Sequence, residues 1–369
     1  MLNNSVPNHS VLIAMSGGVD SSVAAYLLKE QGFSPVGATM CFGLVDVSGN
    51  PKSCCDPRSV SDAKRVCQKL GIQHYVFDYA DELKKYVIDN FIEEYKLGRT
   101  PNPCVRCNSF LKFQSLLSRA KELGLSGIAT GHYAKITEDE TGFHLECADD
   151  KIKDQTYFLW GIKKEDLPNI LFPVSGMEKT ELRKIAEDAG LPTAQKQESQ
   201  DICFVSNGDY RTLLTAYGVE CKKGKMLHTD GRILGEHTGI ENYTIGQRKG
   251  LGIALGEPAF VADINVEKNI VVIGNRNDLL GNYCIVEDCN FLENLDDCDC
   301  ENLTAKIRST MPPAKCRVEK IDGVRHAHPP ITEPAEVKII FDEAQFAITR
   351  GQSAVVYDGN RVVFGGIIK

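Results

Sequence analysis

Apolar and polar residues alternate in the first half of the chain in blocks that predict short strands separated by helices. A continuous apolar run covers 11–15, and further strand-like segments cover 35–40, 74–77 and 127–130. Between them, apolar residues recur with helical spacing over 20–32, 59–70, 81–96 and 109–123. Strands that alternate with helices of this length predict a doubly wound α/β domain with a parallel sheet, in which ligands bind at the carboxyl ends of the strands.

The pattern changes after about Phe204, where glycines become frequent and helical periodicity fades into short β-rich runs. Near the end, apolar runs at 354–357 and 361–364 flank Asp358 and Gly359, which is typical of a β-hairpin turn. We therefore predict three domains: a catalytic α/β domain at 1–207, a small mixed domain at 208–276 and an antiparallel β-barrel at 277–369.

Composition excludes several classes of protein. The 369 residues suffice for two to three domains, and 42% hydrophobic with 25% charged residues are values of ordinary globular chains, not of disordered, collagenous or disulfide-scaffold proteins. No apolar run reaches the roughly 18 residues of a membrane span. The start, MLNNSVPNHS, resembles neither a signal nor a transit peptide. We expect a cytoplasmic protein with no membrane partner.

The charge and the cysteine content are less ordinary. Residues 251–300 hold two basic and ten acidic residues, which accounts for the entire net charge of −8, so the rest of the chain is neutral and a nucleic-acid partner is not excluded. Fourteen cysteines without an export signal favour buried thiols, metal ligands or redox catalysts over disulfide staples.

The string SGGVDSS at 16–22 lies between the first predicted strand and the first predicted helix. Glycines let backbone amides approach an anion, the helix N-terminus adds N–H groups, and the hydroxyls of Ser16, Ser21 and Ser22 add donors. No Gly-Lys-Ser/Thr ending is present, so this is not the P-loop of kinases and GTPases. The alternative is a glycine-rich turn with a Ser/Asp helix cap.

This string resembles the pyrophosphate loop of N-type ATP pyrophosphatases. Those enzymes transfer AMP to a substrate oxygen and release pyrophosphate, with Mg²⁺ neutralising its charge. The resemblance implies ATP contacts by the loop, by Met40 at the adenine and by Gly131 after a strand end. The residues implied in ATP binding are Ala14, Met15, Ser16, Gly17, Gly18, Val19, Asp20, Ser21, Met40 and Gly131.

A second candidate site contains a Cys-x-x-Cys pair. Residues 98–108, GRTPNPCVRCN, read as a loop held extended by its two prolines, in which Arg99 and Arg106 would favour thiolates. Cys203 lies far along the chain beside polar residues. Taken alone, a Cys-x-x-Cys pair indicates zinc, a redox pair or neither, and zinc would require a fourth ligand.

Seven motifs in this order make the chain similar to the tRNA-specific 2-thiouridylases over essentially its whole length. They are SGGVDSS, GRTPNPCVRCN, ATGHY at 129–133, KDQTYF at 153–158, DICF at 201–204, TIGQRKG at 244–250 and GQS at 351–353. The resemblance implies ATP-dependent replacement of oxygen by sulfur at C2 of the wobble uridine of tRNA. It also implies a sulfur-donor protein, such as a cysteine desulfurase or a sulfur carrier.

The resemblance assigns roles to two cysteines by position: Cys107 matches the family's nucleophile, and Cys203 matches the cysteine that carries the persulfide. The implied reaction adenylates uracil O2, transfers the terminal sulfur of Cys203 to C2 and leaves a transient disulfide with Cys107 for a reductant to reset. The two thiols must therefore approach bridging distance in some state.

Cys104 departs from the family, whose better-known members have Asp at this position. The role of that Asp as an acid/base group is therefore in doubt here. Cys104, Cys107 and Cys203 would alternatively hold three corners of a [4Fe–4S] cluster whose fourth iron binds hydrosulfide. The sequence leaves the persulfide and the cluster routes both open.

The remaining candidates concern tRNA and the other cysteines. The resemblance implies tRNA contacts by Asn102, Pro103, His132, Lys153, Asp154, Gln155, Arg308 and Gln352, and short basic runs at 222–225 and 247–249 are further candidates for phosphate contacts. We expect the acidic stretch 251–300 to face away from the tRNA. Cys67 is expected in the core, Cys54 and Cys55 are candidates for metal binding or sulfur relay, and a zinc site on the cysteines of 284–300 is a weaker hypothesis.

Two other functions remain to be distinguished. One is an N-type ATP pyrophosphatase that delivers nitrogen to a small molecule, as argininosuccinate synthase does, which would need neither Cys107 nor Cys203. The other is a non-catalytic iron–sulfur or RNA-binding protein that retains a nucleotide loop and forms no AMP when tRNA is supplied.

Overall fold

The structure is a computed structural model that describes residues 10–43, 57–197, 202–205, 209–253, 256, 258–299, 302–321 and 336–369. The chain forms two compact units. The first comprises 1–87, 104–208 and 360–362, and the second comprises 88–103, 209–359 and 363–369. Across the described ranges, no helix combines the length and the apolar character needed to cross a membrane.

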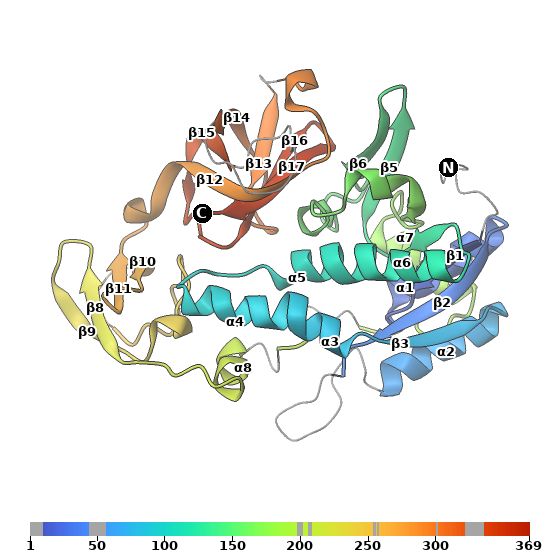
Figure 1. Ribbon diagram of the computed structural model, residues 1–369, viewed down its shortest axis with the longest axis horizontal. Coiled ribbons are helices and arrows are strands. Elements are labelled where there is room, and N and C mark those ends of the chain that lie inside the picture. The colour runs from blue at the N-terminus through green and yellow to red at the C-terminus, as the bar shows by residue number, and fades with distance from the viewer. Residues whose placement is uncertain are drawn as a thin grey trace. The chain divides into compact units, whose positions relative to one another are not determined.

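The first unit is built on a five-stranded parallel sheet with the strand order β3-β2-β1-β4-β7 (Figure 1). Its strands are β1 (Ser10–Ala14), β2 (Ser34–Cys41), β3 (His74–Asp78), β4 (Gly127–Ala129) and β7 (Ile170–Leu171). Since β1 pairs with both β2 and β4, it is central, and its residues Val11, Leu12 and Ile13 are fully buried. The predicted parallel α/β domain is confirmed, because helices connect these strands.

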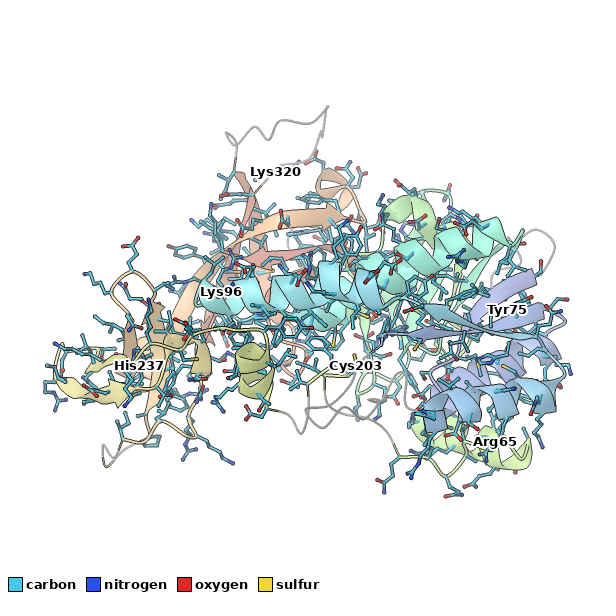
Figure 2. All side chains as sticks on the ribbon, turned by 60° about the horizontal axis from the view of Figure 1, so that its bottom comes forward. Arg65, Tyr75, Lys96, Cys203, His237 and Lys320 are labelled. Carbon is cyan, nitrogen blue, oxygen red and sulfur yellow. The ribbon has the colours of Figure 1, made fainter. Side chains whose placement is uncertain are left out.

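The helices α1 (Val19–Glu30), α2 (Pro57–Leu70) and α7 (Lys179–Asp188) pack against one another or the sheet and contribute to one hydrophobic core. On α2 the buried residues are Ala63, Val66, Cys67 and Leu70, the face that the sequence pattern predicts. Figure 2 shows Arg65 on the outer side of this helix and Tyr75 on the edge strand β3. Cys67 is a core residue, as expected.

The segment that carries the Cys-x-x-Cys pair is helical, so our prediction of a loop over residues 98–108 is wrong from Pro103 onward, whereas 98–102 contain no helix or strand. Helix α5 (Pro103–Arg106) continues into the π-helix η3 (Cys107–Ser115) and then into α6 (Leu116–Glu122). Pro103 is the first helical residue, a position where the missing N–H costs nothing and the fixed φ suits a helix. The second proline therefore starts a helix instead of preventing one.

The other predicted helix, at 81–96, is present in three pieces: α3 (Ala80–Leu83), the π-helix η2 (Lys84–Ile88) and α4 (Asp89–Lys96). The first unit also contains the hairpin β5 (Ala134–Asp139) and β6 (Gly142–Cys147) and the short 3-10 helices η4 (Thr156–Phe158) and η5 (Lys164–Asn169). Arg361 pairs with Glu146 of this hairpin and donates a hydrogen bond to Asp139.

The second unit contains a small mixed sheet with the order β10-β11-β8-β9. Its core includes Met226, Val261, Ile264, Val271 and Ile273, which are all buried. The elements are α8 (Tyr210–Ala216), β8 (Gly224–His228), β9 (Ile233–His237), the 3-10 helix η7 (Ile240–Asn242), β10 (Phe260–Asn265) and β11 (Ile270–Gly274).

The rest of the second unit is an antiparallel barrel, as predicted. Its strands follow the order β12-β15-β14-β13-β16-β17, and pairing of β12 with β17 closes it (Figure 1). Closure removes the exposed edges that an open sheet would leave. The elements are the 3-10 helices η8 (Asn277–Leu279) and η9 (Leu295–Asp297) and the strands β12 (Leu280–Phe291), β13 (Leu303–Lys306), β14 (Ala314–Ile321), β15 (Glu336–Phe346), β16 (Ser353–Asp358) and β17 (Arg361–Ile368).

Candidate functional site

The loop between β1 and α1 is held by close backbone contacts. Gly17 has φ +74°, and a Cβ built on it would lie 2.3 Å from the carbonyl oxygen of Ser59, so both the conformation and the space require glycine. Gly18 is the N-cap residue that precedes helix α1, its backbone is extended, and no described side chain forms a capping hydrogen bond there. The first turn of α1 therefore presents N–H groups that a capping side chain does not occupy.

The three hydroxyls of the loop have different environments. Ser16 is exposed, and its Oγ lies 3.2 Å from that of Ser21. Ser22 is fully buried, donates to the carbonyl of Gly18 and accepts a hydrogen bond of 2.8 Å from Thr193. The expectation that Ser22 offers a donor to a ligand is wrong, because its hydroxyl ties the loop to the core.

Asp20 receives two contacts that the motif did not predict. Its carboxylate oxygen Oδ1 accepts hydrogen bonds from Lys179 Nζ at 2.5 Å and from Tyr133 Oη at 3.1 Å. Lys179 begins helix α7, and its side chain is 12% exposed. The sequence did not point to Lys179, because a lysine that starts an amphipathic helix carries no motif of its own.

Gly131, at the end of β4, lies against the same loop. A Cβ at this position would be 2.7 Å from the backbone nitrogen of Ser21. The carboxyl end of β4 thus meets the loop backbone to backbone, where an α/β sheet binds its ligands. Met40, near the end of β2, is 8% exposed, and its contact with adenine stays a prediction.

The three candidate cysteines all belong to the first unit. Cys104 is exposed, Cys107 is buried, and Cys203 is half-buried on the short described segment 202–205, where Figure 2 labels it. Cys203 raises the pKa of both Cys104 and Cys107, so it lies within electrostatic range of the two thiols. The structure therefore brings together cysteines that are about a hundred residues apart in the sequence.

The thiols are held in their neutral form. The pKa of Cys107 is raised to about 12, chiefly by burial; the charge of Lys112 acts in the opposite direction, and Cys203 and Cys104 contribute to the rise. The same kinds of cause raise the pKa of Cys104, because protein surrounds its sulfur although the residue as a whole is exposed. A neutral thiol is a poor nucleophile, so the chemistry here needs a group that favours the anion.

The expected cation partners of the cysteines are not the arginines. Arg106 donates to the carbonyl of Tyr86 at 2.6 Å, and its guanidinium lies over the ring of Phe110. Within the second unit, Arg99 pairs with Glu94 and Glu287. The cation that acts on Cys104 and Cys107 is Lys112, which we did not predict because we read residues 98–108 as a separate loop.

No metal geometry is present at this site. In the described parts of the chain, no three His, Cys, Asp or Glu side chains are arranged so that they could hold a metal ion. Cys104, Cys107 and Cys203 are all among these residues, so they do not form the three corners of a cluster in this structure. The same holds for Cys284, Cys289 and Cys298, and Cys284 is instead part of the barrel core.

His132 lies beside the cysteine site. Its Nδ1 is 2.7 Å from Thr130 Oγ1, and its Nε2 is 3.4 Å from Lys112 Nζ. Burial and the charge of Lys112 lower the pKa of His132 well below its usual value, so the ring is neutral at pH 7. Because an ammonium only donates, Nε2 is the acceptor and the proton is on Nδ1, which donates to Thr130.

The segment 153–155 is a turn held by several hydrogen bonds. Asp154 accepts hydrogen bonds from the backbone of Ala148 at 3.0 Å and from Thr156 at 2.7 Å. Gln155 accepts one from the backbone N–H of Tyr133 at 2.9 Å, which joins this turn to the strand end that carries Gly131. The predicted tRNA contacts of Lys153, Asp154 and Gln155 stay predictions.

Other candidates belong to the second unit. Gln352 donates to the carbonyls of Thr100 and Pro101, both at 3.1 Å, and so fixes the chain just before Asn102 and Pro103. Arg308 donates to Thr349 at 2.8 Å and to two backbone carbonyls. Their contacts with tRNA stay predictions. Cys54, Cys55, Cys300 and Asp201 lie outside the described residues.

Three family models match the chain in order. The model described as tRNA methyl transferase HUP domain matches residues 9–207. The model described as tRNA methyl transferase PRC-barrel domain matches 212–275, and that described as aminomethyltransferase beta-barrel domain matches 282–368. Together they span nearly all of the chain.

The individual proteins that are similar to this chain are named for thiolation and not for methyl transfer. A tRNA-specific 2-thiouridylase MnmA from Clostridium botulinum (strain Alaska E43 / Type E3) is 45% identical over 369 residues, which cover 99% of each chain. One of the same name from Clostridioides difficile (strain 630) is 44% identical and covers 98% of each chain. A solved 4-thiouridine synthetase–RNA complex with bound ATP is 18% identical, covers 56% of this chain and 50% of that chain, and has a TM-score of 0.33.

Proposed function

This chain belongs to the family of tRNA-specific 2-thiouridylases, and we propose on that premise that it uses ATP to replace the C2 oxygen of the wobble uridine of tRNA with sulfur. The observation that carries the proposal is the proximity of Cys203 to Cys107 within the unit that holds the SGGVDSS loop. Methyl transfer, which the family-model descriptions name, has no use for a pair of thiols in the same unit as an ATP-binding loop. Sulfur transfer uses both.

The loop and its neighbours would bind ATP. Backbone N–H groups of the first turn of α1 and the exposed hydroxyl of Ser16 suit the phosphates, and Gly131 leaves room for the backbone of Asp20 and Ser21. Asp20 is the carboxylate that a Mg²⁺ beside the phosphates would use, and Lys179 supplies a positive charge at the same point. Mg²⁺ would neutralise charge on the departing pyrophosphate.

The sulfur-transfer reaction can be written with balanced atoms and electrons and without a metal ion. The Cys107 thiolate attacks the inner sulfur of the Cys203 persulfide, which forms a Cys107–Cys203 disulfide and releases hydrosulfide. Hydrosulfide attacks C2 of the adenylated uracil, AMP leaves with the former O2, and one proton is lost. A thiol reductant then supplies two electrons to restore both cysteines, and a sulfur-donor protein reloads Cys203.

The substrate is the anticodon arm. The target base must leave the loop stack to reach the thiols, and His132, the 153–155 turn, Asn102, Pro103, Arg308 and Gln352 are the residues proposed to contact tRNA. Phosphate contacts predict binding that weakens steeply with salt. A tRNA substrate together with reduced thiols fits a cytoplasmic location.

The decisive experiment assays iron content, absorption spectrum and 2-thiouridine formation on protein purified without oxygen, for wild type, Cys107→Ser, Cys203→Ser and Cys104→Ser. We expect iron-free wild type and Cys104→Ser to thiolate tRNA, and the other two variants to fail. If Cys104→Ser is inactive and activity requires reconstituted iron, the cluster route replaces the persulfide route.

The same assay tests the small-molecule alternative. An enzyme of the argininosuccinate-synthase type would keep full activity on its acceptor after Cys107→Ser and would not form AMP in response to tRNA. AMP formation that depends on tRNA and 2-thiouridine formation that depends on Cys107 contradict that alternative together. A protein that forms no AMP with any tRNA is not the proposed enzyme.

A further inference from the structure

Lys112 occupies a position in the first unit that neither the motifs nor the proposed reaction explains. It lies in the π-helix η3, five residues after Cys107. The i→i+5 hydrogen bonding of a π-helix brings residues five apart closer to the same face than an α-helix does, where neighbours are three or four apart. The unusual helix therefore turns Lys112 toward the side of Cys107.

Lys112 is also positioned from the other side. Its Nζ lies 3.4 Å from Nε2 of His132, whose ring is fixed by Thr130 at 2.7 Å and packs against Phe113. Among the described residues no carboxylate pairs with Lys112 in the manner that Asp20 pairs with Lys179. A half-buried ammonium with a neutral histidine as its neighbour keeps its charge available for an anion.

The groups around Lys112 indicate which anion its positive charge would stabilise. His132, which is neutral, lies 3.4 Å from the Lys112 ammonium, and Cys107 lies five residues before Lys112 in the same π-helix. The charge of Lys112 lowers the pKa of the Cys104 and Cys107 thiols, and Cys203 raises both. In the proposed reaction the sulfur of Cys107 must become anionic at this place. No other cation acts on the two thiols in the described structure.

We propose that Lys112 is the positioning residue of the sulfur-transfer step: its ammonium, held by His132 and turned by the π-helix, balances the negative charge on Cys107 as that sulfur attacks the Cys203 persulfide. The inference rests on the proposed function, because that function supplies the sulfur-transfer step. The alkylation test does not depend on it. In this proposal the lysine acts through Cys107 and not directly on the base or on ATP.

The test measures site-resolved alkylation of Cys107 by iodoacetamide, from pH 7 to 10, without tRNA or ATP. Lys112→Met keeps the length of the side chain and removes the charge, Lys112→Arg keeps the charge, and Lys121→Met is the control, since Lys121 lies on α6 with its Nζ 3.9 Å from Asp166. Circular dichroism melting identifies any variant that misfolds.

We expect Lys112→Met to slow alkylation of Cys107 by about three- to tenfold at each pH, because a thiol loses about tenfold in thiolate per unit of raised pKa and regains part of this in nucleophilicity. Lys112→Arg should stay within about twofold of wild type, and Lys121→Met should match it. Equal rates for Lys112→Met and Lys121→Met would overturn the inference.

A second measurement separates this inference from the proposed function. In a single-turnover assay with persulfide-loaded protein, the pH profile of 2-thiouridine formation should move to higher pH in Lys112→Met and return in Lys112→Arg. If wild type forms no 2-thiouridine, the proposed function fails, while the alkylation rates still decide the role of Lys112. An unshifted profile in active Lys112→Met protein would contradict the inference.

Discussion

The SGGVDSS loop and the cysteine site lie in the same unit but are held by different kinds of contact. At the loop, main-chain segments pack directly against each other. A Cβ on Gly17 would lie 2.3 Å from a main-chain atom, and a Cβ on Gly131 would lie 2.7 Å from one. At the cysteine site, the contacts come from side chains on separate segments, and burial keeps the Cys107 thiol neutral. Backbone packing therefore determines the shape of the loop, whereas the thiols need a neighbouring positive charge before they can react.

This difference indicates where substitutions will act. In the SGGVDSS loop, where backbone packs against backbone, an added side-chain atom would clash. The loop depends little on any one side chain, apart from those that fix its backbone. A side-chain site depends on individual atoms, which single substitutions can remove one at a time. The two regions should therefore respond to different variants and in different measurements.

The largest expected effect is the separation of the two half-reactions. Cys107→Ser and Cys203→Ser should each lower 2-thiouridine formation by about a thousandfold or more, because no other thiol replaces the missing sulfur. AMP formation in the presence of tRNA should stay within about threefold of wild type, since the loop is unchanged. Parallel assays of AMP and 2-thiouridine check this, and loss of both together would break the distinction.

Next is a matched pair of glycines in left-handed conformations. A Cβ on Gly17 (φ +74°) would meet the Ser59 carbonyl, while a Cβ on Gly32 (φ +84°) would have no other residue's atoms within 4 Å. Gly32→Ala should cost about 1 kcal/mol of unfolding free energy, from backbone strain alone. Gly17→Ala should cost about 3 kcal/mol or more, because the close contact adds to the same strain, and should weaken ATP binding. Urea unfolding and ATP titration measure both, and equal costs would show that the close contact is unimportant.

Alkaline pH should destabilise the protein through its buried thiols. Cys107, Cys284 and Cys316 have pKa values raised to about 12 by burial, against about 9 in the unfolded chain. Their stabilising contribution is complete below pH 9 and is lost as pH rises from 9 towards 12, because the unfolded chain ionises first.

We expect the unfolding free energy to fall over that range by up to about 1.4 kcal/mol per pH unit for each buried thiol. Cys284→Ala should be less stable than wild type at pH 7 but show a shallower decline above pH 9. Urea denaturation at pH 7, 9 and 10 tests this, and a decline as steep as that of wild type would show that Cys284 does not contribute.

The smallest expected effect concerns the acidic stretch 251–300. If this stretch faces away from tRNA, reversing exposed charges there with Glu267→Lys and Asp297→Lys should change tRNA affinity by less than about twofold at physiological salt. The reason is that salt screens charges that are farther from the tRNA than the Debye length of about 8 Å. Filter binding at two salt concentrations measures it. A gain of tenfold or more would place this stretch beside the tRNA.

Much of the architecture could be predicted from local patterns. The apolar run before SGGVDSS predicts the central strand, the face of α2 with Ala63, Val66 and Cys67 predicts its packing, and the Asp-Gly turn predicts the last hairpin. These predictions succeed because burial on one face and turn chemistry are local properties. The helix that starts at Pro103 was not predicted, because a proline can either end or begin a helix and its own position in the sequence does not distinguish the two.

Residue types and their spacing identify the candidates: the glycines that a tight anion-binding loop requires, and the Cys-x-x-Cys pair together with Cys203 in a distant motif. The partners of these residues follow from how the chain is folded in three dimensions. Lys179 pairs with Asp20, which lies 159 residues earlier in the chain. Lys112 contacts His132, which lies 20 residues later, and it follows Cys107 by five residues in the same π-helix. Pairing of charges depends on distance in space and on burial, and neither can be read from the order of residues along the chain.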